Sequence, residues 1–235
     1  MSEGITLVIN QPTFLPWLGY FDLINKADSF IALNTVQFSR QSWQQRNRIK
    51  TPNGAAWLTV PIQRSFGEKI LDVKISYATD WQYKHLKTIE QSYKKTPFFE
   101  KVFPMLEEIY NTSPRFLADL NVLIIKEVCT YLNIKTALVC AHEIPIEKHE
   151  KVPYVLDLCD YMHTKTYLNG AAGKKLYDPK DFEERKINLV FHDYHHPVYN
   201  QLHGEFVPYL SIVDALCNCG SSVRDFFETS AAPSL

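Results

Sequence analysis

Short apolar runs alternate along the chain with segments of helical periodicity. Residues 5–9 read as a buried strand, a short helix is expected at about 19–27, and residues 30–33 form a second apolar run. The same pattern predicts later strands at 137–140, 166–168 and 187–194. It predicts helices at 152–161 and 206–216. Strands that alternate with helices indicate an α/β fold with a mostly parallel sheet that begins with a β-α-β unit.

The middle of the chain is expected to be a helical insert. From residue 80 to about residue 133 the apolar positions follow a helical period, as in Trp81, His85 and Ile89 at i, i+4 and i+8. Breaks near residue 97 and at 113–114 divide this segment into three helices. We expect residues 1–229 to form a single domain with this insert, followed by a flexible tail at 230–235.

Two further strands are expected before the insert. Residues 57–62 are mostly apolar, and residues 70–75 alternate apolar with charged side chains, which is the period of a strand. The two strands are predicted to pair through a turn at residues 65–67.

Composition narrows the class of protein. The 235 residues are 46% hydrophobic and 22% charged, as in globular chains, and the net charge of −1 gives no general reason to expect nucleic acid. The chain has neither a signal sequence nor an apolar run that could span a bilayer, so we expect a cytoplasmic protein without membrane insertion. Five cysteines without CxxC spacing are expected to be reduced and buried.

Positive charge is concentrated in one segment. No acidic residue occurs between Asp28 and Glu68, although five basic residues do: Arg40, Arg46, Arg48, Lys50 and Arg64. If residues 44–50 are extended, alternate side chains project from one face. Arg46, Arg48 and Lys50 then form a comb suited to phosphate oxygens, and a solvated basic face is the alternative.

The proline-rich loop after the first strand is a second candidate. Residues 11–21 lead from the carboxyl end of that strand to a helix N-terminus, which is the edge where open α/β sheets bind ligands. Gln11, Trp17 and Tyr20 offer polar and aromatic surfaces there. The alternative is that the loop's large apolar side chains only anchor it in the core.

A third candidate follows the strand expected to end at Leu168. Gly170 would let a ligand approach the backbone closely, and Lys174 would meet its negative charge. The spacing is not that of a Walker motif, so a plain tight turn is the alternative.

Four histidines, at 192, 195, 196 and 203, lie at the end of the last expected strand and just after it. In an extended chain His192 and His195 point to opposite faces, whereas His192 and His196 stand about 13 Å apart at roughly 3.3 Å per residue. We therefore predict no metal site and no cofactor. His196 is the candidate general base, and Tyr199 and Gln201 are candidate substrate-binding residues.

Several blocks of residues resemble the WbqC-like protein family. They are Gln-Pro-x-x-x-Pro-Trp-x-Gly-Tyr-Phe at 11–21, Val-Gln-Phe at 36–38, Ser-Trp-Gln-Gln-Arg-Asn-Arg-Ile-Lys-Thr-Pro-Asn-Gly at 42–54, Leu-Asn-Gly-Ala at 168–171 and His-Pro-Val-Tyr-x-Gln at 196–201. The resemblance spans about residues 5–220 and adds Gln37, Asn47 and Asn169 to the expected substrate-binding residues. It departs at Asn34-Thr35, where the family usually has an acidic pair, so Asn34 receives no catalytic role.

The resemblance implies a role in the assembly of O-antigen and related surface polysaccharides. One activity suggested for the family is transfer of glycine to an amino sugar. The partners would be a nucleotide-linked amino sugar and an activated amino acid, either a charged tRNA or an aminoacyl adenylate. The basic comb would bind phosphate, His196 would deprotonate the sugar's amine, and the amine would attack directly, since no acyl-enzyme nucleophile is evident.

Two other functions remain open from the sequence. One is a different acyl or nucleotidyl transferase, and the other is a non-catalytic sugar-nucleotide-binding or scaffolding protein of the same pathway. A screen of donors distinguishes the first, whereas tight binding without turnover indicates the second.

Overall fold

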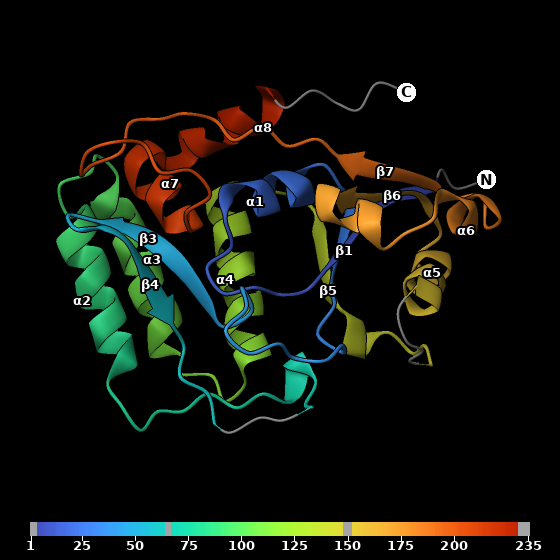
Figure 1. The fold of residues 1–235 in the computed structure, drawn as a ribbon, viewed down its shortest axis with the longest axis horizontal. Helices are drawn as coiled ribbons and strands as arrows, with labels where there is room; N and C mark the ends of the chain where they lie inside the picture. Colours follow the sequence, from blue (N-terminus) through green and yellow to red (C-terminus); the bar gives the residue numbers. More distant parts are fainter. Residues whose placement is uncertain (1–3, 64–66, 148–151, 230–235) are drawn as a thin grey trace.

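The structure is a computed structural model that describes residues 4–63, 67–147 and 152–229 (Figure 1). Its main sheet has five parallel strands in the order β5-β2-β1-β6-β7. These are β1 (Ile5–Asn10), β2 (Ser29–Ala32), β5 (Ala137–Cys140), β6 (Thr164–Gly170) and β7 (Asn188–His192). With α1 (Leu18–Asn25) between β1 and β2, the predicted α/β fold and its β-α-β start are confirmed.

Both faces of this sheet are buried. Leu7 and Ile9 of β1 pack in a cluster with α5 (Val152–Tyr161) and α6 (Pro179–Glu183). Val8 points to the other face and belongs to the larger cluster. Successive side chains of a strand alternate between faces, so a strand covered on both sides is a continuous apolar run, as predicted for β1.

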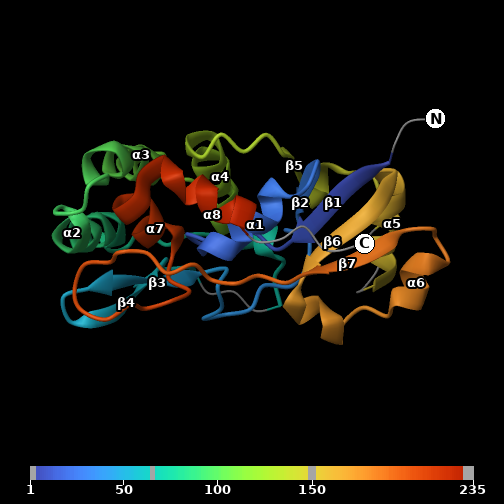
Figure 2. The ribbon, with the colours of Figure 1, turned by 90° about the horizontal axis from the view of Figure 1, so that it is seen from above.

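The predicted helical insert is confirmed as three helices on one side of the sheet. They are α2 (Trp81–Tyr93), α3 (Phe99–Asn111) and α4 (Leu117–Tyr131), and they are separated where the sequence indicated. The short helices α7 (Ile212–Cys219) and α8 (Asp225–Thr229) lie near them (Figure 2). Single 3-10 turns cover Ile70–Asp72, Ala141–Glu143, Ala171–Lys175 and Gly220–Arg224. Among the described residues, no helix is long and apolar enough to cross a membrane.

The prediction for residues 57–75 was partly wrong. The strand found is β4 (Gly54–Thr59), and its partner is β3 (Arg46–Thr51) in an antiparallel hairpin. Residues 70–75 make only isolated bridges, because Ile70–Asp72 forms a 3-10 turn whose apolar side chains pack inward. The backbone N–H of Leu117 then donates to the carbonyl of Val73, at 2.9 Å, which ties this segment to α4. Residues 65 and 66 of the expected turn lie outside the described residues.

Two predicted elements near the C-terminus have different bounds. The helix expected at 206–216 begins at Ile212, because Ser211 caps its first turn and accepts a hydrogen bond from the N–H of Val213 at 3.3 Å. Tyr209, just before this cap, has a positive φ of 57°, which no helix admits. The last strand of the sheet ends at His192 rather than at 194. The tail expected at 230–235 lies outside the described residues.

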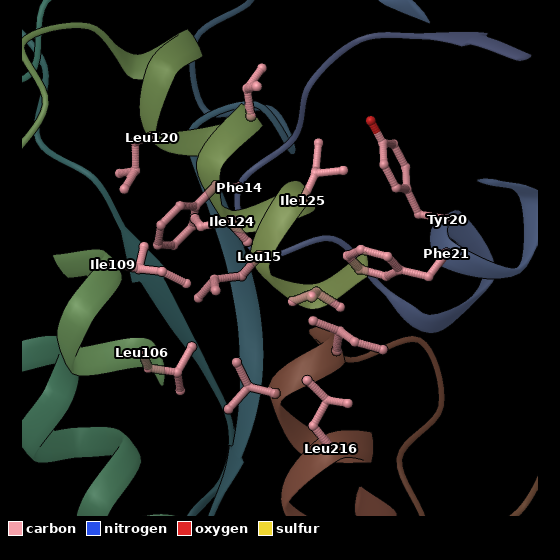
Figure 3. Close-up of a cluster of buried hydrophobic side chains, with 14 of the residues drawn as sticks. Phe14, Leu15, Tyr20, Phe21, Leu106, Ile109, Leu120, Ile124, Ile125 and Leu216 are labelled. Carbon is pink, nitrogen blue, oxygen red and sulfur yellow. The ribbon is translucent and has the colours of Figure 1, made fainter. Parts of the chain in front are cut away.

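The proline-rich loop is anchored in the core between the sheet and the helical insert. Phe14 and Leu15 are fully buried and meet Ile109 and Ile124 of the insert (Figure 3). Asn121 of α4 holds the loop from the same side, because its amide donates to the carbonyls of Pro12, at 3.1 Å, and of Gln44, at 2.8 Å. The loop's large apolar side chains therefore anchor it in the core, as the alternative held, and they fix its path toward α1.

Candidate functional site

A crevice opens at the carboxyl edge of the parallel sheet, between β1 and β6. From β1 the sheet extends to β2 and β5 on one side, and β6 and β7 lie on the other side. The loops that leave β1 and β6 therefore turn away from each other, and open α/β sheets bind ligands at such a point.

Two adjoining cavities occupy this crevice, and we call them together the cleft. The larger one, of about 450 Å³, lies toward the β3–β4 hairpin, and the smaller one, of about 350 Å³, lies over the strand ends of β6 and β7. They are hereafter the hairpin-side cavity and the sheet-side cavity. Both are lined by Asn10, Trp17, Tyr20, Ala172 and Tyr209.

Five of the predicted binding residues line the cleft. Arg48 and Asn47 belong to the hairpin-side cavity, Gly170 belongs to the sheet-side cavity, and Trp17 and Tyr20 line both. The structure therefore brings part of the proline-rich loop and part of the basic segment to the same cleft.

Tight packing fixes the aromatic wall of the cleft. The ring of Trp17 meets that of Tyr194 at 4.9 Å and that of Tyr209 at 5.5 Å, both edge-on. A Cβ on Gly19 would stand 2.3 Å from the Trp17 ring, so only glycine leaves room for it. The hydroxyl of Tyr20 donates to the carbonyl of Gln11 at 2.9 Å, which attaches this wall to the strand end.

Asn47 supports the proline-rich loop from the hairpin. Its amide donates to the carbonyl of Leu15 at 2.7 Å, and its oxygen accepts from the N–H of Arg48 at 2.8 Å. Leu15 has a positive φ of 42°, which is costly for a side chain with a Cβ and needs such support. Asn47 is buried, so its contribution to the cleft is mainly to hold the loop and Arg48 in place.

The basic comb is present in part. Residues 46–50 are extended in β3 as predicted, and Arg48 reaches the cleft. Lys50 departs from the expectation, since it is 1% exposed and its Nζ donates to three oxygens. These are Gln201 Oε1 at 3.1 Å, the carbonyl of Gly204 at 3.3 Å and the carbonyl of Glu205 at 2.5 Å. All three donors of the ammonium are engaged, and Lys50 fastens the 201–205 loop to the hairpin instead of facing the cleft.

Tyr199 and Gln201 belong to a buried network around Asp214. The Tyr199 hydroxyl donates to Asp214 Oδ2 at 2.8 Å, the Gln201 amide donates to the same oxygen at 2.7 Å, and the Tyr93 hydroxyl donates to Oδ1 at 3.0 Å. Burial raises the pKa of Asp214 although these hydrogen bonds oppose the shift. Neither Tyr199 nor Gln201 lines the cleft, so their position indicates a structural role.

His196 lies behind the cleft wall. Its ring meets that of Tyr209 at 4.9 Å, and its Nδ1 is 2.8 Å from the carbonyl of Pro197. Burial lowers the pKa of His196, so its neutral form is favoured. The His196 ring lines neither cavity. Tyr209 lies between this ring and a ligand in the cleft.

The remaining predicted residues also lie outside the lining of the cleft. Gln11 accepts from the Gln44 amide at 2.7 Å, and Gln37 is exposed. The Asn169 amide donates to the Tyr167 hydroxyl at 2.6 Å. Lys174 is exposed, with its Nζ 6.0 Å from the centre of the Phe191 ring.

Sequence reasoning missed a pair of residues at the sheet-side cavity. His192 lines this cavity, and its Nε2 is 2.5 Å from Oδ2 of the fully buried Asp22. Oδ1 of Asp22 is 2.6 Å from the ammonium of Lys26. The carboxylate accepts the Nε2–H of His192, and this leaves Nδ1 as the basic nitrogen. The available signal was Asp22 itself, the only charged residue in the apolar helix α1.

The described residues contain no group of three or more His, Cys, Asp or Glu side chains placed to hold a metal ion. His192 is held by Asp22, while His195 is exposed and 4.0 Å from Asp193. The cleft combines aromatic surfaces, one guanidinium and one imidazole held by a carboxylate. These groups can bind a phosphorylated ligand and accept a proton from it.

Replacing Lys50 tests whether it is structural. Lys50→Met should lower the free energy of unfolding in urea by about 1.5–3 kcal/mol, because three oxygens lose the charged donor that the buried Lys50 supplies. The exposed Lys84→Met, in α2, serves as the control and should change little. If Lys50→Met is as stable as the wild type but no longer binds the ligand, Lys50 contacts the ligand's phosphates, as the sequence first suggested.

Comparison with known proteins places the chain in a family. The model of the WbqC-like protein family matches residues 11–225. Rv1507c of Mycobacterium tuberculosis, described as an uncharacterized protein, is 34% identical over 226 residues, which cover 94% of this chain and 96% of that protein. No solved structure gives a significant match. The chain therefore belongs to the WbqC-like protein family.

Proposed function

We propose that this protein is a transferase that attaches a glycyl group to the amine of a nucleotide-linked amino sugar. The observation that carries the proposal is Arg48, which lines an aromatic cleft at the ligand-binding edge of the sheet. The structure describes neither a hydrogen bond nor an ion pair of its guanidinium, and its Nε is buried without a partner. A buried donor of this kind favours an anionic ligand.

The hairpin-side cavity fits the nucleotide part of such a substrate. Trp43 and Trp17 offer aromatic surfaces for a base, and Arg48 offers a planar donor for the diphosphate. The sugar then extends into the sheet-side cavity, where nothing lies within 4 Å of the place a Cβ on Gly170 would take, so a ligand can approach closely. This orientation brings the amine of the sugar toward His192.

The pair of Asp22 and His192 supplies the base that the reaction needs. An amine attacks an acyl carbon only as the neutral species, so its ammonium form must first give up a proton. Nδ1 of His192 accepts this proton, and the carboxylate of Asp22 holds the ring and stabilises the imidazolium. The proposed base is therefore His192. In this proposal His196 only packs against Tyr209 in the cleft wall.

The state of the cysteines favours direct attack by the amine over a mechanism in which a cysteine forms an acyl-enzyme. None of the cysteines lines the cleft. Burial raises the pKa of Cys159 to about 12 and that of Cys140 to about 11, so neither is a thiolate at neutral pH. In this proposal the protein aligns the two substrates and carries one proton between them. Family membership supports a place in surface-polysaccharide assembly, with the reaction in the cytoplasm, where nucleotide sugars are made.

Replacing Arg48 tests the phosphate contact. Arg48→Ala should weaken binding of a nucleotide-linked amino sugar by about 1.5–3 kcal/mol, measured by isothermal titration calorimetry, because a charge-assisted contact is lost. Arg40→Ala is the matched control, since Arg40 is exposed in the same acid-free segment and does not line the cleft. If the two variants bind the sugar nucleotide with equal affinity, the nucleotide does not bind in the hairpin-side cavity.

Replacing His192 tests the proton acceptor. His192→Gln keeps an amide that can donate to Asp22 and should lower the rate of glycyl transfer by about 10²–10⁴-fold while the sugar nucleotide still binds. The product is measured by mass spectrometry with charged tRNA or glycyl adenylate as donor, and the exposed His195→Gln is the control. If the wild-type protein binds the sugar nucleotide tightly but transfers nothing from either donor, it is a binding protein and not a transferase.

A further inference from the structure

The outer face of the β3–β4 hairpin carries a cluster of aromatic and cationic side chains. Arg48 lies directly opposite Trp57 in the antiparallel register, and Arg46 lies opposite Thr59. Residues paired in this way share one face of the hairpin, whereas Leu58 points to the buried face. We call Trp43, Trp57, Arg46 and Arg48 the hairpin platform.

Two large aromatic rings of the platform face solvent. Trp57 is 46% exposed and Trp43 is 49% exposed, and their ring centres are 5.6 Å apart. Because two indole rings stay half exposed, the protein forgoes the favourable free energy that their full burial would give. Neighbouring exposed aromatic rings of this kind are typical of a surface that binds a partner.

Among the residues that the structure describes, none gives the guanidinium groups of the platform an anionic partner. That of Arg46 lies 4.3 Å from the centre of the Trp57 ring, and that of Arg48 lies 5.7 Å from it. The Nε atoms of both arginines are buried without a hydrogen-bond partner in the part of the chain that is described. No residue between Asp28 and Glu68 is acidic, so the hairpin itself offers no carboxylate to either arginine.

We propose that the hairpin platform binds the unpaired 3′ end of an aminoacylated RNA. An unpaired base stacks on Trp57 and the phosphate beside it accepts from Arg46, while Trp43 and Arg48, at the border of the cleft, stay with the nucleotide-linked sugar. This inference rests on the proposed function, because it identifies the donor of the glycyl group. Trp43 and Arg48 also line the hairpin-side cavity, so a strand on the platform ends beside the cleft that holds the amine.

The chemistry of the platform favours this ligand over others. A glycan also stacks on tryptophan, but its hydroxyls require acceptors as well as donors, and the two arginines offer donors only. A duplex keeps its bases stacked on each other and cannot use the indole rings, whereas unpaired bases can. The protein as a whole is not basic, so the RNA contact is confined to this face.

The transfer balances with this donor. The amine of the sugar attacks the carbonyl carbon of the glycyl ester, and a C–N bond forms while the C–O bond to the terminal ribose breaks. The ammonium form of the amine gives up two protons in all: one is released to solvent, and His192 passes the other to the ribose oxygen, which leaves as a hydroxyl. No other co-reactant is required.

The proposal is tested with a fluorescently labelled single-stranded RNA that ends in CCA, titrated with the full chain at low salt while anisotropy is measured. Trp57→Ala should weaken this binding at least about tenfold, since base stacking on an aromatic ring is lost. Tyr83→Ala, which removes an exposed ring elsewhere (66% exposed), should leave it unchanged. Arg46→Gln should weaken binding and lower its dependence on salt.

A parallel titration with a nucleotide-linked amino sugar separates this proposal from the proposed function. Trp57 and Arg46 do not line the cleft, so the variants at these positions should bind the sugar nucleotide like the wild type. Three results would each contradict RNA binding by the platform. The RNA does not bind, it binds equally well to Trp57→Ala, or a neutral oligosaccharide binds in its place and depends on Trp57. If the wild type does not bind the sugar nucleotide, the proposed function is contradicted, whereas the result of the RNA titration is unaffected.

Discussion

The order of strands in the parallel sheet is the constraint on which the rest of this structure depends. Because β2 and β6 flank β1 on opposite sides, the segments that follow β1 and β6 diverge and leave a crevice at the sheet's carboxyl edge. The walls of that crevice come from distant parts of the chain: the start of α1, the β3–β4 hairpin, the turn after β6 and the segment around Tyr209. Each wall must be attached to the sheet by contacts of its own.

Buried polar groups provide these attachments. Asn121 and Asn47 donate hydrogen bonds to carbonyls of the proline-rich loop, and Lys50 binds the 201–205 loop to the hairpin. Asp214 collects hydrogen bonds from α2 and from the segment before α7. A buried polar group left without its partner costs stability, so such contacts specify one arrangement of the loops. Arg48 and Arg46 differ from this group because their side chains lack such partners among the described residues, which is why we assign them to ligands.

Sequence patterns predicted the sheet and the insert well, because these elements follow hydrophobic period. The same patterns failed for residues 70–75, where an alternating run packs as a 3-10 turn against α4, and for the start of α7, where a cap at Ser211 overrides apolar periodicity. For the cleft, the sequence indicated that the loop lies at the carboxyl edge of the sheet and that the segment with Arg48 is extended, because both follow from the pattern of the strands. The burial of Lys50 and the pairing of Asp22 with His192 depend on contacts between residues more than a hundred positions apart, which periodicity does not contain.

The central claim is that one cleft binds a nucleotide-linked amino sugar with its phosphates at the hairpin and its amine at the sheet. A crystal structure of the complex tests this most directly. We expect phosphate oxygens within hydrogen-bond distance of the Arg48 guanidinium and the sugar's amine within reach of Nδ1 of His192. A nucleotide bound away from Arg48, or a sugar oriented with its amine away from His192, would contradict the account.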